Sequence, residues 1–211
     1  KVLPNIIKYS GKKNIKALVT KNGFSALSTI NNFNLDCYSD SDYRVVCKDL
    51  NIGTIFILTR HNTHFEIIKE GLKRGKNIFV EKPTVLLASE LEQLREIIKE
   101  NSLNRNLIHT GYNRRFSPHI KFAKSKLNNC SSPIMVNIRV NAGKIKHDHW
   151  VMNEEGGGRN IGECCHFYDL MSYITNSKVQ SLNAIVIPSN METKHSPDNF
   201  IVNLQFENGS I

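Results

Sequence analysis

The segment Asn77–Pro83 contains residues whose types and order could do chemistry. An apolar run that reads as a buried strand, Asn77–Val80, ends in Glu81-Lys82-Pro83. A strand that ends this way presents the Lys82 ammonium at the mouth of a sheet. There it could donate a hydrogen bond to a substrate oxygen and stabilise negative charge developing on it. Pro83 fixes the turn, and a cis peptide bond before it would help to aim Lys82 inward. Taken alone, the same residues also fit a surface loop with a charged pair.

A second polar segment, His147-Asp148-His149-Trp150, has two interpretations. Two imidazoles and a carboxylate in one loop can bind zinc, but no Cys/His pair lies nearby at the spacing typical of zinc sites. We therefore expect no metal, and instead a polar loop that faces a substrate, with Trp150 as an apolar wall.

Composition and charge exclude several classes of protein. Lys and Arg number 28 against 19 Asp and Glu, a net charge of +9. The basic residues are scattered, which argues against nucleic-acid binding but fits a solvated surface or attraction to an anionic dinucleotide or nucleotide-sugar. No apolar run approaches the roughly 18–20 residues of a membrane helix. Five cysteines without a C-x-x-C pair indicate reduced thiols in a cytoplasmic protein.

Strands and helices must position these residues, and the first half of the chain alternates between the two. Strands are predicted at Ile15–Thr20, Thr54–Thr59, Asn77–Val80 and Leu107–Gly111, and helices at Ser25–Phe33, His64–Arg74 and Leu86–Glu100. This alternation indicates βαβ units and a parallel sheet whose ligands bind at the carboxyl ends of the strands. The run Thr54–Thr59 is apolar almost throughout, as in a strand buried on both faces. Functional residues of this half should follow Thr20, Thr59, Val80 and Gly111.

The pattern changes after Phe116. A helix is predicted at Pro118–Leu127 and another at about Glu163–Ile174, after Gly156-Gly157-Gly158; strands are predicted at Ile134–Asn141, Val179–Ile187 and Asn199–Phe206, the last leading to an Asn208-Gly209 turn. The expected fold class is α/β. A Rossmann-like parallel-sheet domain would occupy residues 1–115, and an α/β domain with a largely antiparallel sheet residues 116–211.

Three motifs together resemble the Gfo/Idh/MocA (glucose–fructose oxidoreductase/inositol dehydrogenase) family. Val80–Pro83 looks like the family signature, Gly111–Phe116 resembles the stretch that joins its two domains, and Trp150–Asp169 looks like the loop and helix that carry its catalytic histidine. The resemblance spans nearly the whole chain. It implies an NAD(P)-dependent dehydrogenase or reductase, with NAD or NADP as cofactor, acting on the CH–OH group of a sugar, cyclitol or nucleotide-sugar.

The resemblance also implies that both domains are incomplete. Family members open with a strand and a G-x-G-x-x-G turn that binds the pyrophosphate, and nothing here matches it. The first strand and its turn are therefore expected upstream of Lys1, and the C-terminal sheet is expected to continue beyond Ile211. Related proteins often pair through that sheet, so the complete protein is expected to be a homo-oligomer.

By resemblance, Lys82 would contact the nicotinamide ribose and the reacting hydroxyl, and His166 would be the general acid/base. An imidazole with an ordinary pKa of about 6.5 suits proton exchange near neutrality. Asp169, three residues later on the same helix face, could accept a hydrogen bond from His166 and fix its tautomer. Arg114 or Arg115 would hold the domain junction or a substrate oxygen, although Arg115 fits a surface salt bridge equally well. Trp150 would line the substrate site.

The resemblance further implies a set of residues that line the cofactor cleft. These are Thr59, Asn62, His64, Glu81, Lys82 and Pro83. His64 also fits a cap or packing role at the start of its helix, because a histidine by itself specifies little.

Two departures from the family pattern leave alternatives open. The position four before His166, often Asp in the family, is Gly162, so either Glu163 substitutes although it should face differently, or the chain is a catalytically silent dinucleotide-binding sensor of the same fold. At the end of the first strand, Thr20-Lys21 replaces the acidic residue common in NAD-preferring domains. Lys21 could accommodate a 2′-phosphate or point into water, so NAD and NADP both remain possible.

Overall fold

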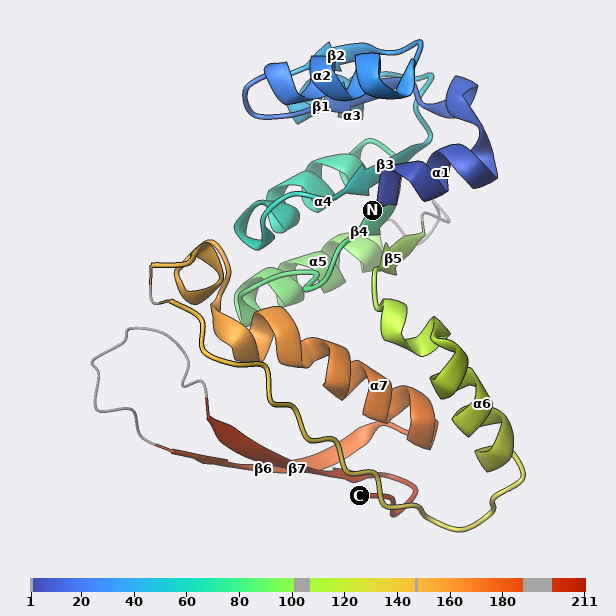
Figure 1. Ribbon diagram of the computed structural model, residues 1–211, viewed down its shortest axis with the longest axis vertical. Coiled ribbons are helices and arrows are strands. Elements are labelled where there is room, and N and C mark those ends of the chain that lie inside the picture. The colour runs from blue at the N-terminus through green and yellow to red at the C-terminus, as the bar shows by residue number, and fades with distance from the viewer. Residues whose placement is uncertain (1, 101–106, 147, 188–198) are drawn as a thin grey trace. The chain divides into compact units, whose positions relative to one another are not determined.

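The computed structural model describes residues 2–100, 107–146, 148–187 and 199–211 (Figure 1). They form two compact units that interleave along the sequence. The first unit comprises Lys1–Ile57, Glu66–Phe79 and Gln93–His109, and the second comprises Leu58–Phe65, Val80–Glu92 and Thr110–Ile211. The domain division predicted near residue 115 stays a prediction.

The first unit begins with helix α1 (Val2–Ser10) and a small parallel sheet. Strand β1 (Ala17–Val19) pairs with β2 (Tyr38–Asp40), and helix α2 (Phe24–Phe33) connects them. Helix α3 (Tyr43–Lys48) follows, and the Asp42 side chain caps it by accepting a hydrogen bond from the Arg44 amide. The sequence predicted β1 and α2. It did not predict β2 and α3, because these two elements are short and their polar residues interrupt the periodic spacing of apolar residues.

A second parallel sheet has the order β3-β4-β5, with strands β3 (Thr54–Ile57), β4 (Asn77–Val80) and β5 (Ile108–Thr110). Helix α4 (His64–Lys73) joins β3 to β4, and α5 (Ala88–Glu100) lies between β4 and β5. The predicted βαβ pattern is confirmed here. Because its strands are parallel, their carboxyl ends share one edge, from which the residues after Ile57 and Val80 emerge.

The prediction that the strand at Thr54–Thr59 is buried on both faces is wrong. Ile57 is 2% exposed, but Phe56 keeps 42% and Leu58 43% of their surface. The Phe56, Phe79 and His109 rings lie against one another across the three strands, with centroids 5.2 and 5.6 Å apart. On the face of the sheet that carries Phe56, these rings cover one another only in part, so the strand stays partly exposed there.

The second unit contains helices α6 (Pro118–Leu127) and α7 (Cys165–Thr175) and an antiparallel pair, β6 (Val179–Val186) and β7 (Phe200–Phe206). The predicted turn follows β7, with Gly209 at a φ of +81°. No helix in the described part of the chain is long and apolar enough to cross a membrane.

The strand predicted at Ile134–Asn141 does not form. Its backbone makes two hydrogen bonds to Ile211, from Val136 N to the Ile211 oxygen and from Ile211 N to the Ile134 oxygen. Alternating apolar residues suit an extended segment, but a ladder of two bonds with a single residue is too short to be a strand.

A buried lysine holds the loop before β3. Lys76 is 4% exposed, and its Nζ lies 2.6 Å from the carbonyl oxygens of both Asp49 and Ile52. Buried carbonyls without a donor cost free energy, so this ammonium satisfies two acceptors at the end of α3.

We predict that Lys76→Met lowers the free energy of unfolding by about 2 kcal/mol, because it leaves both carbonyls without their charged donor. Chemical denaturation measures the change. The matched control is Lys73→Met in the exposed last turn of α4, for which a change below about 0.5 kcal/mol is expected. Equal effects of the two substitutions would contradict the role of Lys76.

Candidate active site

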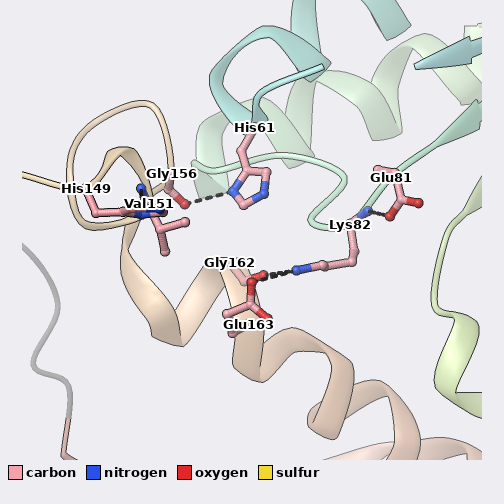
Figure 2. A network of polar contacts seen from close by, with 8 residues as sticks. All are labelled: His61, Glu81, Lys82, His149, Val151, Gly156, Gly162 and Glu163. Atoms are coloured by element: carbon pink, nitrogen blue, oxygen red, sulfur yellow. Dashed lines mark hydrogen bonds and ion pairs between the residues drawn. The ribbon is translucent and has the colours of Figure 1, made fainter. Parts of the chain in front are cut away.

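The centre of the site is Lys82, two residues after β4 in the second unit (Figure 2). Its Nζ lies 2.6 Å from the carbonyl oxygen of Gly162 and 3.0 Å from Oε1 of Glu163, and its side chain is 15% exposed. The predicted cis peptide bond between Lys82 and Pro83 is confirmed. An ammonium has three N–H donors, so within the described part of the chain one donor remains for a ligand oxygen.

Glu163 reaches Lys82 because the backbone before α7 is not an ordinary α-helix. Residues Asn160–Cys164 form a π-helical turn, which is wider than an α-helical turn and changes the direction in which side chains point. The Tyr168 hydroxyl donates to Oδ1 of Asn160 at 2.6 Å and fastens the start of this turn to α7. Of the alternatives left open by the sequence, the geometry favours a carboxylate supplied by Glu163.

His166 lies in the first turn of α7 and is 7% exposed. Its Nδ1 is buried and has no hydrogen-bond partner among the described residues. The Tyr112 ring packs edge-on at 6.1 Å between centroids. Burial and then the Lys82 and Arg114 charges lower the pKa of His166 from 6.5, whereas Glu163 and Asp169 oppose that shift. The imidazole is therefore neutral at neutral pH.

Asp169 does not orient His166 as the sequence suggested. Its carboxylate binds Arg115, with Nε 2.6 Å from Oδ2 and a second contact from the guanidinium to Oδ1. A guanidinium matches a carboxylate with two parallel N–H bonds, which a single imidazole N–H cannot do. The Asp169 hydrogen bond raises the pKa of Arg115. The pair ties the segment after β5 to α7.

Arg114, the neighbouring residue, is exposed, and its guanidinium lies 4.7 Å from the centroid of the Phe167 ring. Its assignment to a substrate oxygen or to a domain junction stays a prediction.

His64 supports the site from inside the protein and does not line it. The residue is 0% exposed. Its Nδ1 lies 2.8 Å from the Pro83 oxygen and its Nε2 lies 3.1 Å from the Thr59 oxygen. The alternative of a packing role is therefore the correct one, because a ring with both nitrogens facing backbone carbonyls offers nothing to a cofactor. His64 joins the residue that follows β3 to the turn that carries Lys82.

The sequence missed His61, which is 7% exposed and packs over Gly162. A Cβ at residue 162 would lie 3.1 Å from Cε1 of His61 and 3.2 Å from the Gly156 oxygen. Nδ1 of His61 lies 2.9 Å from that same oxygen, across 95 residues of sequence (Figure 2). His61 lies just after Thr59, where functional residues were expected. However, no local sequence pattern shows which residues its ring contacts.

The Trp150 loop is attached to the same segment. The indole lies 4.9 Å from the His61 ring and 5.5 Å from the Arg60 guanidinium, which also forms an ion pair with Glu155. The backbone N–H of Asn62 donates a hydrogen bond to the backbone carbonyl oxygen of Glu155. His147 lies outside the described residues, and among those described no group of three potential ligands could hold a metal ion.

The other sequence-predicted positions are placed as follows. Thr59 and Asn62 are exposed beyond the carboxyl end of β3, Pro83 is buried, and Oε2 of Glu81 accepts from the Lys82 amide at 3.3 Å. Thr20 and Lys21 belong to the first unit, after β1.

In the first unit a hollow of about 480 Å³ lies at the carboxyl ends of β1 and β2. Lys21, Asn22, Gly23, Ser39, Asp40 and Ser41 line it. The adjacent Thr20 Oγ1 is buried, with no partner among the described residues. A polar hollow at this edge of a parallel sheet suits one end of a dinucleotide. Because Lys21 and Asp40 both line the hollow, its charge does not select between NAD and NADP.

Comparison with known proteins assigns the family. Residues 2–109 match the sequence profile of Gfo/Idh/MocA, an oxidoreductase family with an NAD-binding Rossmann fold. The chain belongs to this family, as the three motifs in the sequence indicated.

Among curated proteins, the chain is 29% identical over 180 residues to the uncharacterized oxidoreductase YrbE of Bacillus subtilis, covering 82% of this chain and 51% of that protein. It is 27% identical over 187 residues to scyllo-inositol 2-dehydrogenase (NAD(+)) of the same organism, covering 83% and 51%. The chain thus spans about half the length of these relatives.

Solved structures share the fold. A levoglucosan dehydrogenase in complex with NADH and levoglucosan superposes with a TM-score of 0.75 at 19% identity, covering 92% of this chain and 55% of that one. The myo-inositol dehydrogenase of Lactobacillus casei, in complex with NAD(H) and myo-inositol, gives 0.70 at 18%, covering 93% and 57%.

We predict that the Arg115–Asp169 pair responds unequally to removal of its two partners. Asp169 is 7% and Arg115 38% exposed. Arg115→Ala leaves a buried carboxylate unpaired and should cost about 3 kcal/mol of unfolding free energy, whereas after Asp169→Ala the guanidinium can turn to water, at about 1–2 kcal/mol. Chemical denaturation of both single variants and the double variant measures this asymmetry. The reverse order would contradict it.

Proposed function

We propose that this chain belongs to an NAD(P)-dependent dehydrogenase or reductase that transfers hydride between nicotinamide and the CH–OH group of a sugar, cyclitol or nucleotide-sugar. The observation that carries the proposal is the pairing of Lys82 with the turn that leads into His166. Nζ of Lys82 is bound to Gly162, four residues before a buried imidazole whose Nδ1 has no partner among the described residues. The Lys82 charge also lowers the pKa of His166, and we propose that this cation and this neutral base act on the same substrate oxygen.

The proposed cofactor and substrate class follow the relatives. One is a scyllo-inositol 2-dehydrogenase that uses NAD(+), and another was crystallised with NADH and levoglucosan. Both names describe a polyhydroxylated ring compound. Thr20 and Lys21 in the first unit are proposed to contact the cofactor, together with Thr59, Asn62 and Glu81, whereas His64 and Pro83 position the Lys82 turn. A homo-oligomer stays a prediction for the intact protein.

The hollow beside Trp150 supports a substrate larger than a single sugar ring. Its volume is about 680 Å³, and its lining includes Arg60, Lys144 and Lys146 together with Asp148 and Glu155. Because Arg60 already pairs with Glu155, the remaining charges of this wall are two lysines and one carboxylate. A phosphorylated or nucleotide-linked sugar suits this wall, and Trp150 offers an apolar face to its ring.

The mechanism assigns one role to each group. When bound, NAD(P) would supply nicotinamide C4 as the hydride acceptor in the direction of oxidation. The neutral His166 ring accepts the hydroxyl proton while the carbinol carbon loses hydride, so that the alcohol becomes a ketone. The remaining N–H of Lys82 donates to the carbinol oxygen and stabilises the negative charge that develops on it. In the direction of reduction, His166 returns the proton.

We expect Lys82→Ala and His166→Ala, made in the intact protein, each to lower kcat/KM for polyol oxidation by about 100-fold or more, because each removes a group that acts on the reacting oxygen. Dinucleotide affinity should change less than about threefold. Reduced-nicotinamide absorbance with a panel of polyols measures the first quantity, and calorimetric titration the second.

The matched controls for these two substitutions are Lys126→Ala and His119→Ala on the exposed surface of α6, which should leave the rates unchanged. Near-normal turnover in both Lys82→Ala and His166→Ala would end the proposal. Loss of turnover with intact dinucleotide binding would support it.

The pH dependence of oxidation follows from the lowered pKa of His166. Only the neutral ring can accept a proton, so activity is lost as pH falls through that pKa. Because burial and Lys82 move the pKa below 6.5, kcat/KM for oxidation should keep its plateau down to that pH and decline only below it. The pH–rate profile measures the midpoint. A midpoint at pH 7 or above, lost in His166→Ala, would contradict the predicted direction.

A further inference from the structure

We propose that Glu163 is the positioning residue of this site. Its carboxylate holds Lys82 in place and sets the charge around His166. The His61 ring, packed over Gly162, fixes the backbone from which Glu163 extends. The turnover measurements that test this inference rest on the proposed function. The thermal and NMR titration measurements can be made whether or not the protein turns over a polyol.

Two contacts hold Lys82 in place. Its ammonium contacts two consecutive residues, the Gly162 carbonyl at 2.6 Å and the Glu163 carboxylate at 3.0 Å. The Lys82 side chain is 15% exposed, so removal of its charge partner would leave a nearly buried cation with one neutral acceptor. Glu163, at 46% exposure, is the more solvated partner. The Glu163 carboxylate therefore positions Lys82, whereas without the lysine this carboxylate would still be solvated.

The backbone before α7 allows both contacts at once. Gly162 lies in the π-helical turn Asn160–Cys164, under the His61 ring and beside the Gly156 oxygen. Any side chain at residue 162 would come closer to His61 than ordinary van der Waals contact, and the ring cannot retreat without breaking its 2.9 Å contact with that oxygen. His61 and Gly162 thus fix the turn from which Glu163 reaches Lys82 (Figure 2).

Several charged groups surround His166. The titratable and charged groups that face it are Lys82, Tyr112, Arg114, Glu163, Cys165 and Asp169. Asp169 is already bound to Arg115. Lys82 is the charged group with the largest effect on His166, and Glu163 opposes it more strongly than Asp169 does. If Glu163 becomes neutral, the larger of these two opposing charges is lost and the His166 pKa falls further.

The first test is Glu163→Gln in the intact protein, with Glu154→Gln in the exposed neighbouring loop as the matched control. The titration midpoint of the His166 ring, followed by NMR of labelled histidine, should move to lower pH in Glu163→Gln and not in the control. The kcat/KM for polyol oxidation should fall about tenfold, and its acid limb should shift in the same direction. Dinucleotide affinity should stay within about twofold.

The second test separates the packing of residue 162 from the charge of residue 163. Gly162→Ala should lower the thermal midpoint and turnover together, because a Cβ at residue 162 would lie 3.1 Å from Cε1 of His61 and 3.2 Å from the Gly156 oxygen. Gly53→Ala is the control, because nothing lies within 4 Å of a Cβ at that position. A thermal midpoint no lower in Gly162→Ala than in Gly53→Ala would overturn the packing of His61 over Gly162.

The outcomes distinguish this inference from the proposed function. An unchanged His166 midpoint and unchanged turnover in Glu163→Gln, while His166→Ala is inactive, would overturn the inference and leave the function standing. A shifted midpoint in a protein that oxidises no polyol would support the inference and remove the function.

Discussion

The second unit is organised around one cation, the ammonium of Lys82, placed where water reaches it poorly. A nearly buried charge is tolerated only when it is paired and hydrogen-bonded. Here the Gly162 carbonyl and the Glu163 carboxylate both come from one π-helical turn, so a single backbone feature supplies the two partners. The position of that turn then fixes where α7 begins and where His166 lies. The lysine and the imidazole therefore cannot be displaced independently.

Long-range contacts of different chemistry keep the surrounding loops in place. His64 joins the Thr59 and Pro83 carbonyls, His61 joins Gly156 to the segment after β3, and the Arg115–Asp169 ion pair ties the segment after β5 to α7. The two histidines contact backbone oxygens from buried positions, and the ion pair joins a buried carboxylate to a partly exposed guanidinium. The proposed chemistry would thus take place among loops that are tied to one another, not among free surface segments.

The sequence predicted most elements that rest on local pattern. The predicted bounds of β4 and α6 match those of the structure, because both depend on local signals. Strand β4 is a short apolar run between a glycine turn and Glu81, and α6 begins at Ser117-Pro118. The Ile134–Asn141 segment failed because a strand needs a partner along its length, which no alternation of residues can show. Asp169 failed for a related reason. Spacing placed it on the face of His166, but Arg115, 54 residues away, offered the better geometry.

Trp150 gives the site its own spectroscopic label, since it is the one tryptophan in the sequence. Its indole lies against the His61 ring and the Arg60 guanidinium, and both protonated imidazole and nearby cations alter the emission of an excited indole. Tryptophan emission of this chain therefore arises at the loop that packs against His61 and Arg60, with no contribution from another indole of the chain. Occupancy of the site can be followed optically without attaching a dye or knowing the substrate.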